Sequence, residues 1–314
     1  MGHYGFTAIA KAIERNMRQS SHTLYPCEPH LIYPMCNAIA ITGLRGYDRL
    51  HDDDLGVDLV DKIRDSFTRN GYLAPNGRFL FGRGPLGIKM PSMLANDAVM
   101  AFWLHGVMPD LAEETWQILR RDHMRITNGV ARLRTQPIDH MDVGSYRKSD
   151  AWAWVNIACA AKEMGDDEAA NAVDAGIAAR FTMDYSESGA RKIADASMWV
   201  NTVFALSRFV TAGSLRGLAT GEVPAQWRTG PILKAAAYPV VLVAKAVTDG
   251  SGLDLVLRPG AGPARTTLEI ARLRPGRTYR VTGATVDSLV ANGHGNALLD
   301  IDLRRRLEVR LVPA

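Results

Sequence analysis

Apolar residues recur at helical spacing through the first two-thirds of this 314-residue chain, and the pattern stops near residue 215. Leu55, Leu59, Ile63 and Phe67 stand four residues apart, as on the buried side of an amphipathic helix. Similar spacing predicts helices over residues 6–17, 34–50, 55–69, 93–105, 112–124, 150–164, 168–181 and 197–209. Repeated helix pairs joined by turns favour a mainly α fold of the α/α-toroid type.

The last third of the chain has a different character. Residues 220–231 are rich in turn formers, and short runs of strand-like composition follow at 240–247, 253–257, 266–270, 279–282, 297–302 and 307–311. Turns such as Asp249-Gly250-Ser251-Gly252 separate these runs. Short strands at this spacing predict a small β-sandwich. We therefore expect two domains, 1–218 and 219–314, of which the second serves for packing or for a subunit contact.

Composition excludes several function classes. Hydrophobic residues make up 47% and charged residues 22% of the chain, the balance of an ordinary globular protein. A net charge of +4 without interleaved aromatic and basic residues argues against a nucleic-acid partner. No apolar stretch predicts a membrane span and no signal peptide is visible, so the default location is the cytoplasm. No P-loop or G-x-G-x-x-G pattern follows a predicted strand, so no cofactor is expected.

Two of the three cysteines, Cys27 and Cys36, lie nine residues apart. Pro34 suits the first position of a helix, because proline lacks the N–H that would be unpaired there. Cys36 then falls in the first helical turn, where the positive end of the helix dipole favours the thiolate. The alternatives are two ordinary core residues, a disulfide in an oxidising compartment, or a zinc site shared with His22 and His30.

The amino-acid sequence of this segment resembles that of a known family. It reads C-E-P-x4-P-x-C-N over residues 27–37 and is followed by Gly-Leu-Arg-Gly-Tyr-Asp-Arg-Leu-His over residues 43–51. This sequence motif resembles the linalool dehydratase/isomerase family, in which two cysteines at the same spacing line the active site. The resemblance continues more weakly through residues 104–106 and 161–166 and covers about residues 5–215.

The resemblance implies a fold and a reaction. The fold would be an (α/α)6 barrel, here expected without one or more N-terminal helices, because an early family histidine and an N-terminal aspartate and tyrosine have no counterpart at the family spacing. The reaction would be dehydration or isomerisation of a hydrophobic allylic alcohol by a cofactor-independent hydro-lyase or isomerase. Cys27 and Cys36 would be the catalytic residues, since a thiol and a thiolate can act as acid, base or nucleophile.

Four residues near the cysteines are candidates for substrate binding. Tyr33 and Met35 fall where the family places pocket-lining side chains, although Met35 replaces an expected amide. Glu28 would orient Cys27 or brace the loop, and Asn37 would hydrogen-bond backbone near the helix start. The resemblance implies a small hydrophobic alcohol as partner, no metal, and a homo-oligomer, because family members form rings.

Two other functions are compatible with the sequence. Many α/α toroids act on sugars, and Asp139, His140 and Asp142 form a compact acid–histidine–acid sequence to which Asp150 and Glu163 would add carboxylates. The tryptophans that would stack on sugars are Trp103, Trp116, Trp152 and Trp154. A catalytically degenerate scaffold is the third hypothesis, and it predicts no sizeable pocket near either set of residues.

Overall fold

The computed structural model describes residues 6–20, 24–142, 149–185, 191–260 and 262–314. The chain divides into two compact units, Met1–Gly221 and Glu222–Ala314. Each unit has hydrophobic clusters made only of its own residues, as expected of separate domains.

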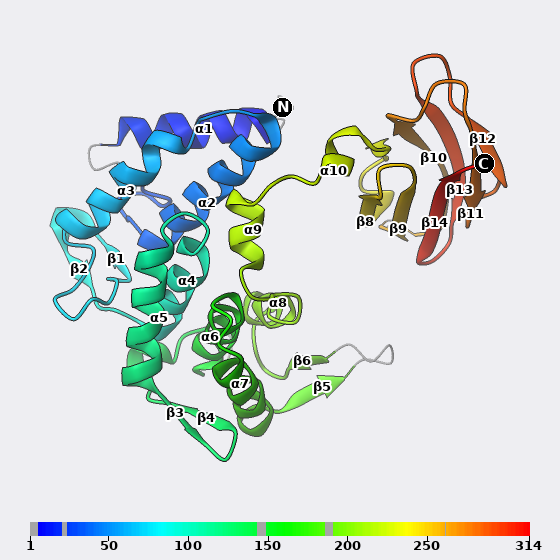
Figure 1. The fold of residues 1–314 in the computed structure, drawn as a ribbon. Coiled ribbons are helices and arrows are strands. Elements are labelled where there is room, and N and C mark those ends of the chain that lie inside the picture. Colours follow the sequence, from blue (N-terminus) through cyan, green and yellow to red (C-terminus); the bar gives the residue numbers. More distant parts are fainter. Residues whose placement is uncertain (1–5, 21–23, 143–148, 186–190, 261) are drawn as a thin grey trace. The chain divides into compact units, whose positions relative to one another are not determined.

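Helices supply most of the first unit (Figure 1). They are α1 (Phe6–Gln19), α2 (Pro34–His51), α3 (Val57–Arg69), α4 (Leu94–Leu104), α5 (Pro109–His123), α6 (Ala151–Glu163), α7 (Asp167–Arg180), α8 (Met198–Leu206) and α9 (Ser214–Thr220). Each predicted helix is present. The starts of α1 and α2 agree with the prediction and other ends differ by a few residues; α5, for example, begins at Pro109, because proline suits a first helical position. Among the helices in the described ranges, none is long and apolar enough to cross a membrane.

Small antiparallel sheets interrupt these helices. Within the described residues they pair β1 (Gly82–Arg83) with β2 (Lys89–Met90), β3 (Met124–Thr127) with β4 (Val130–Leu133), and β5 (Met183–Tyr185) with β6 (Arg191–Ile193). Helix makes up 43% and strand 24% of the described residues. The predicted mainly α toroid is therefore wrong. The fold is mixed α/β with several sheets, and its helices do not plainly form an (α/α)6 barrel (Figure 1).

The β3–β4 hairpin shows why the helical periodicity was misleading. Met124 is buried and continues the apolar spacing of α5, so the sequence pattern extends the predicted helix by one residue. The signal for a hairpin stands four residues later. Asn128 and Gly129 have positive φ angles of 53° and 73°, which suit the two central residues of a type I′ turn.

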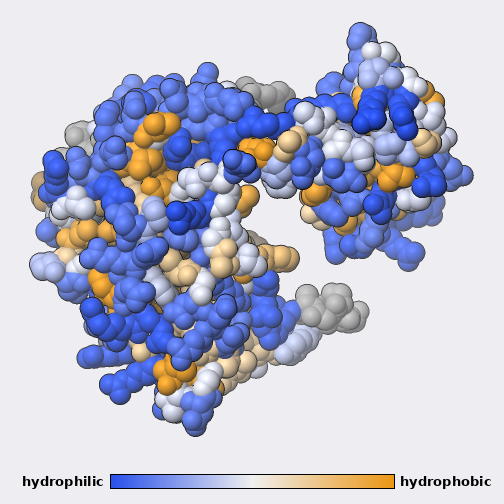
Figure 2. All heavy atoms as spheres, in the orientation of Figure 1, coloured by the Kyte–Doolittle hydropathy of each residue, from blue (hydrophilic) through white to orange (hydrophobic). Residues whose placement is uncertain are grey.

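The core of the first unit lies around α4 and α6. Both helices are buried around almost their whole circumference, which is typical of central helices. His105, directly after α4, hydrogen-bonds Glu163 at the end of α6, so these neighbouring helices run in the same direction. Met35 of α2 packs against both hydrophobic clusters of the unit. Hydrophilic residues cover most of the surface visible in Figure 2, with apolar groups in small patches.

The second unit is a pair of antiparallel sheets that face one core. After the short helix α10 (Ala225–Thr229), its strands are β7 (Ile232–Ala235), β8 (Val241–Thr248), β9 (Leu253–Pro259), β10 (Ala264–Ala271), β11 (Thr278–Thr282), β12 (Ser288–Val290), β13 (Ala297–Leu303) and β14 (Leu307–Pro313). The strand orders are β13-β10-β7 and β12-β11-β14-β9-β8. Alternate residues point inward, such as Leu255 and Leu257 from one sheet and Leu299 and Ile301 from the other, which is the packing of a β-sandwich.

Candidate active site

Asn37 fixes the start of α2 to the loop before it. Its side chain is buried, and its Oδ1 accepts a hydrogen bond from the Tyr25 N–H at 2.7 Å. Its Nδ2 donates to the carbonyls of Tyr25 at 3.0 Å and Tyr33 at 3.1 Å. These bonds occupy the oxygen and both protons of the amide with backbone partners. Asn37 therefore holds the segment that carries Cys27 against the helix start and is not free to bind a substrate.

The loop between the cysteines is tied to β1. It turns at His30, which has a positive φ of 62°. Ile32 and Arg83 then exchange two backbone hydrogen bonds of 2.9 Å each. This pairing places Gly82 directly against the ring of Tyr33, since a Cβ at residue 82 would lie 2.9 Å from Cδ1 of that ring. Backbone pairing with β1 thus sets the position of Tyr33.

We expect Gly82→Ala to displace Tyr33 without unfolding the chain. The added Cβ would lie 2.9 Å from the Tyr33 ring and 3.1 Å from the Ile32 carbonyl oxygen. Because both distances are too short, the Tyr33 ring must shift. A shift of this kind should lower kcat/KM for a reaction at the cysteine pair roughly tenfold, with an unchanged circular dichroism spectrum. Gly84→Ala is the matched control, because its Cβ would meet nothing closer than 3.6 Å. Full activity in Gly82→Ala would show that the position of Tyr33 does not matter for the reaction.

Cys27 and Cys36 lie side by side at the start of α2. Both are free thiols, Cys27 exposed and Cys36 partly buried, so the disulfide alternative is not the state of this structure. Burial, a hydrogen bond with Cys27 and the charges of Cys27 and Glu28 together raise the pKa of Cys36 to about 12. This direction is opposite to the effect expected from the helix dipole, because desolvation and neighbouring negative charge outweigh it. Cys36 is therefore the protonated thiol.

Three aromatic side chains lie next to one another from Tyr33, between the cysteines, to Trp152 in the core of the first unit. The rings of Tyr33 and Phe81 lie 5.2 Å apart, and those of Phe81 and Trp152 lie 6.4 Å apart, edge to face. Trp152 is buried at the start of α6. Burial, followed by the charges of Glu28 and the two cysteines, raises the pKa of Tyr33. The thiols, a carboxylate and a phenol thus lie within electrostatic reach of one another beside an aromatic wall.

The remaining candidates from the sequence have different positions. Met35 is partly buried between the two hydrophobic clusters, so its main contacts are with the core. Glu28 is exposed and acts on Cys36 through its charge. Among the described residues, no group of three or more potential ligands could hold a metal ion, and His22 of the zinc alternative lies outside those residues.

Phe81 and Gly82 were not predicted as site residues. They lie against Tyr33 because the neighbouring Arg83 pairs with Ile32 through the backbone. That pairing joins residues about 50 positions apart, and a single sequence carries no signal for such a register. The glycine next to an aromatic residue was the one local cue, because a missing side chain often marks a close approach of another group.

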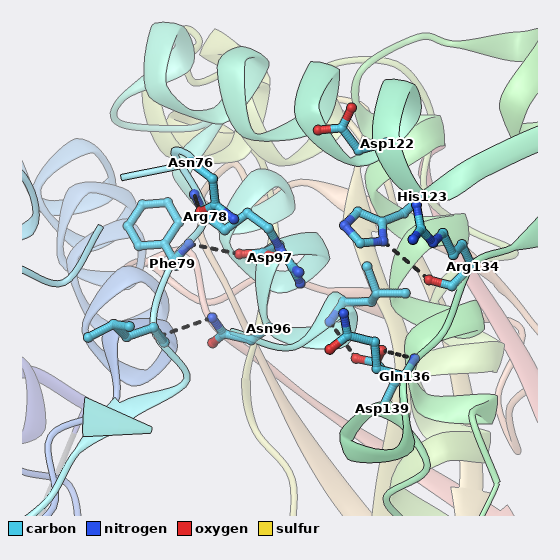
Figure 3. Close-up of polar contacts among 12 residues, drawn as sticks. Asn76, Arg78, Phe79, Asn96, Asp97, Asp122, His123, Arg134, Gln136 and Asp139 are labelled. Atoms are coloured by element: carbon cyan, nitrogen blue, oxygen red, sulfur yellow. Dashed lines mark hydrogen bonds and ion pairs between the residues drawn. The ribbon is translucent and has the colours of Figure 1, made fainter. Parts of the chain in front are cut away.

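The acid–histidine–acid sequence does not form a catalytic cluster. Asp139 is buried, and its Oδ1 accepts a hydrogen bond from the Leu94 N–H at 2.7 Å, at the start of α4 (Figure 3). Asp142 accepts one from the Ser197 N–H at 2.8 Å, at the start of α8. His140 between them is exposed. The two carboxylates therefore serve the starts of different helices, a structural role.

The other groups of the sugar hypothesis also have structural partners. Asp150 accepts hydrogen bonds from Arg180 at 2.8 Å and from Nε1 of Trp154 at 3.3 Å. Trp116, Trp152 and Trp154 are buried. None of these three rings is exposed to stack on a sugar.

Glu163 joins α4, α6 and α9 at the opposite end of α6 from Trp152. Its buried Oε1 accepts hydrogen bonds from Nδ1 of His105 at 2.9 Å and from the Arg216 N–H at 3.0 Å. Its Oε2 accepts from the Leu215 N–H at 2.8 Å and the Ser214 hydroxyl at 3.1 Å. Burial acts to raise the pKa of Glu163, but these hydrogen bonds together hold it below its ordinary value. The carboxylate is thus a structural anchor.

Comparison with known proteins agrees with the resemblance in the cysteine segment. The family model described as linalool dehydratase/isomerase matches residues 3–199, which is more than half of the chain and includes the whole site around Cys27 and Cys36. No curated protein matches the chain.

Proposed function

Because the chain belongs to the linalool dehydratase/isomerase family, we propose that it is a hydro-lyase or isomerase that acts on a hydrophobic allylic alcohol through Cys27 and Cys36. Lyase or isomerase activity follows from the family. The finer proposal depends on one observation, the contact of two thiols of different burial at the start of α2. The aromatic run of Tyr33, Phe81 and Trp152 supports an apolar substrate.

Dehydration needs an acid at the hydroxyl and a base at the neighbouring carbon. Cys36 is held protonated, so it donates its proton to the leaving hydroxyl, which departs as water. The allylic cation that develops lies beside aromatic faces, which attract positive charge. Cys27 acts as the base: its sulfur takes up a proton from the carbon next to the cation, and the electron pair of that C–H bond forms the new double bond.

The hydrogen bond between the cysteines restores the starting state. After elimination Cys27 is a thiol and Cys36 a thiolate, and the proton returns from the first to the second across their contact. The alcohol has then become a diene and one water molecule, with no proton gained or lost by the protein. In isomerisation, water instead adds to the other end of the allylic cation and gives one proton to the Cys36 thiolate, which yields the rearranged alcohol and restores the Cys36 thiol.

The proposal is tested by incubating the protein with acyclic and cyclic monoterpene alcohols without oxygen and analysing the headspace for dienes. We expect product from an allylic alcohol, none from its saturated analogue, and at least a roughly thousandfold lower kcat in Cys27→Ala and Cys36→Ala. Cys159→Ala is the matched control, because Cys159 is buried in the core, and it should retain activity. Turnover that survives both site variants, or no product from any allylic alcohol, would contradict the proposal.

A further inference from the structure

The β3–β4 hairpin presents a strongly basic face. In its register Arg125 stands directly opposite Arg132, and the Arg134 N–H donates to the His123 carbonyl at 2.8 Å. Side chains alternate across a strand, so these four residues share one face of the hairpin. The other face carries Met124, which is buried in the core. The arginines of the hairpin are all exposed.

The positive charge on this face is not balanced within the protein. Like charges directly opposite one another destabilise an antiparallel pair, yet Arg125 and Arg132 occupy such a position. In the part of the chain that the structure describes, no carboxylate forms an ion pair with Arg125, Arg132 or Arg134. The nearest acid, Asp122, makes its ion pair with Arg121 at 2.7 Å. The arrangement costs stability unless an anion from outside occupies it.

These residues surround a groove of about 440 Å³ at the junction of α5 and the hairpin. Its walls are Arg121, Asp122, His123, Met124, Arg125, Arg132, Leu133 and Arg134. The lining thus contains four guanidinium groups and a single carboxylate, that of Asp122. The groove lining contains no phenylalanine, tyrosine or tryptophan ring on which a nucleobase could stack, which disfavours single-stranded nucleic acid as the occupant.

A buried arginine adds a donor behind the groove. Arg78 donates through Nε to Asp97 at 2.7 Å, but its buried Nη2 has no hydrogen-bond partner. Figure 3 shows its guanidinium between Asp97 and His123. Burial, together with the charge of Arg78, lowers the pKa of His123, whose Nδ1 contacts the Arg134 carbonyl at 3.2 Å. In a neutral imidazole whose Nδ1–H faces this carbonyl, Nε2 is an acceptor, so His123 adds neither a donor nor a positive charge to the groove.

We propose that this groove binds a small multivalent oxyanion of the di- or polyphosphate class. Guanidinium groups bind phosphate oxygens in pairs, and two arginines opposite each other on a hairpin can hold adjacent phosphates. The volume suits a small ligand. This site is separate from the cysteine pair and does not depend on the proposed reaction.

Titration of the full chain with inorganic pyrophosphate by calorimetry at low salt tests this site. We expect saturable binding that is tighter than that of phosphate and falls roughly tenfold or more in Arg125→Gln/Arg132→Gln. The matched control is Arg280→Gln/Arg305→Gln, which removes the same charge from exposed arginines of the second unit and should bind pyrophosphate as the wild type does.

Three results would overturn the site. The first is an absence of saturable pyrophosphate binding. The second is an equal loss in both double variants, which would indicate only diffuse charge. The third is binding to vesicles that contain phosphatidylserine with no binding of free pyrophosphate, which would assign the groove to a lipid surface. Circular dichroism of each variant confirms that a loss is not due to unfolding.

Discussion

At pH 8, iodoacetamide is expected to alkylate Cys27 roughly a hundred times faster than Cys36. Only the thiolate reacts, and with a pKa of about 12 no more than roughly one Cys36 in ten thousand is ionised at this pH. Cys27, by contrast, is exposed at the surface. Mass spectrometry of peptides after timed alkylation gives both rates in one experiment.

The pH dependence of this reaction has a definite direction. Because the pKa of Cys36 is raised, its alkylation rate should rise roughly tenfold per pH unit until the pH approaches 12. Cys159 serves as an internal standard, since burial raises its pKa to about 12 as well. In Cys27→Ala, Cys36 loses a hydrogen bond and a neighbouring charge that both raise its pKa, so it should react faster than in the wild type. Preferential alkylation of Cys36 in the wild type would contradict the assignment of Cys36 as the protonated thiol.

Glu163→Gln should have the largest effect on stability. The substitution keeps the shape of the side chain but removes the charge that accepts four hydrogen bonds in a buried position. We expect the free energy of unfolding of the first unit to fall by about 2–4 kcal/mol, measured by urea unfolding at pH 7. Glu168→Gln is the matched control. Glu168 is exposed and pairs with Arg120 at 2.8 Å, so its loss should cost less than about 1 kcal/mol.

The effect of Glu163 should also depend on pH in one direction. Its pKa in the folded state is lowered, so the charge contributes fully above the ordinary carboxyl pKa of about 4.3 and is lost as the pH falls through the lower folded value. The difference in stability between wild type and Glu163→Gln should therefore shrink below about pH 4. A difference that is unchanged from pH 7 to pH 3 would mean that shape, and not charge, explains the loss.

The helices could be predicted because their signals are local. The spacing of apolar residues located α1 to α8 but not the short helix α9, and Pro34 marked the start of α2 at the correct residue. Asn37 was expected to bond backbone near that start, and it does. The arrangement of the helices was not local information. The toroid was expected from the helix pairs and from the family resemblance, and the small sheets between the pairs change the fold class.

The chemistry of the site was harder to predict than its location. The cysteine segment was evident from spacing, but the expected thiolate at Cys36 was wrong in direction, because partial burial and the approach of Cys27 and Glu28 depend on tertiary structure. Met35 could not be assigned to the core from sequence for the same reason. The weaker family similarity at residues 104–106 and 161–166 includes His105 and Glu163, which are structural partners and not site residues.

Helix α6 carries Trp152 of the aromatic wall near its first residue and Glu163 at its last. Eleven residues of helix separate the two by roughly 17 Å, and mutational effects at sites this far apart usually add independently. The aromatic wall and the Glu163 anchor thus lie at opposite ends of one helix, so a substitution at Trp152 should change stability by the same amount with and without the Glu163 carboxylate.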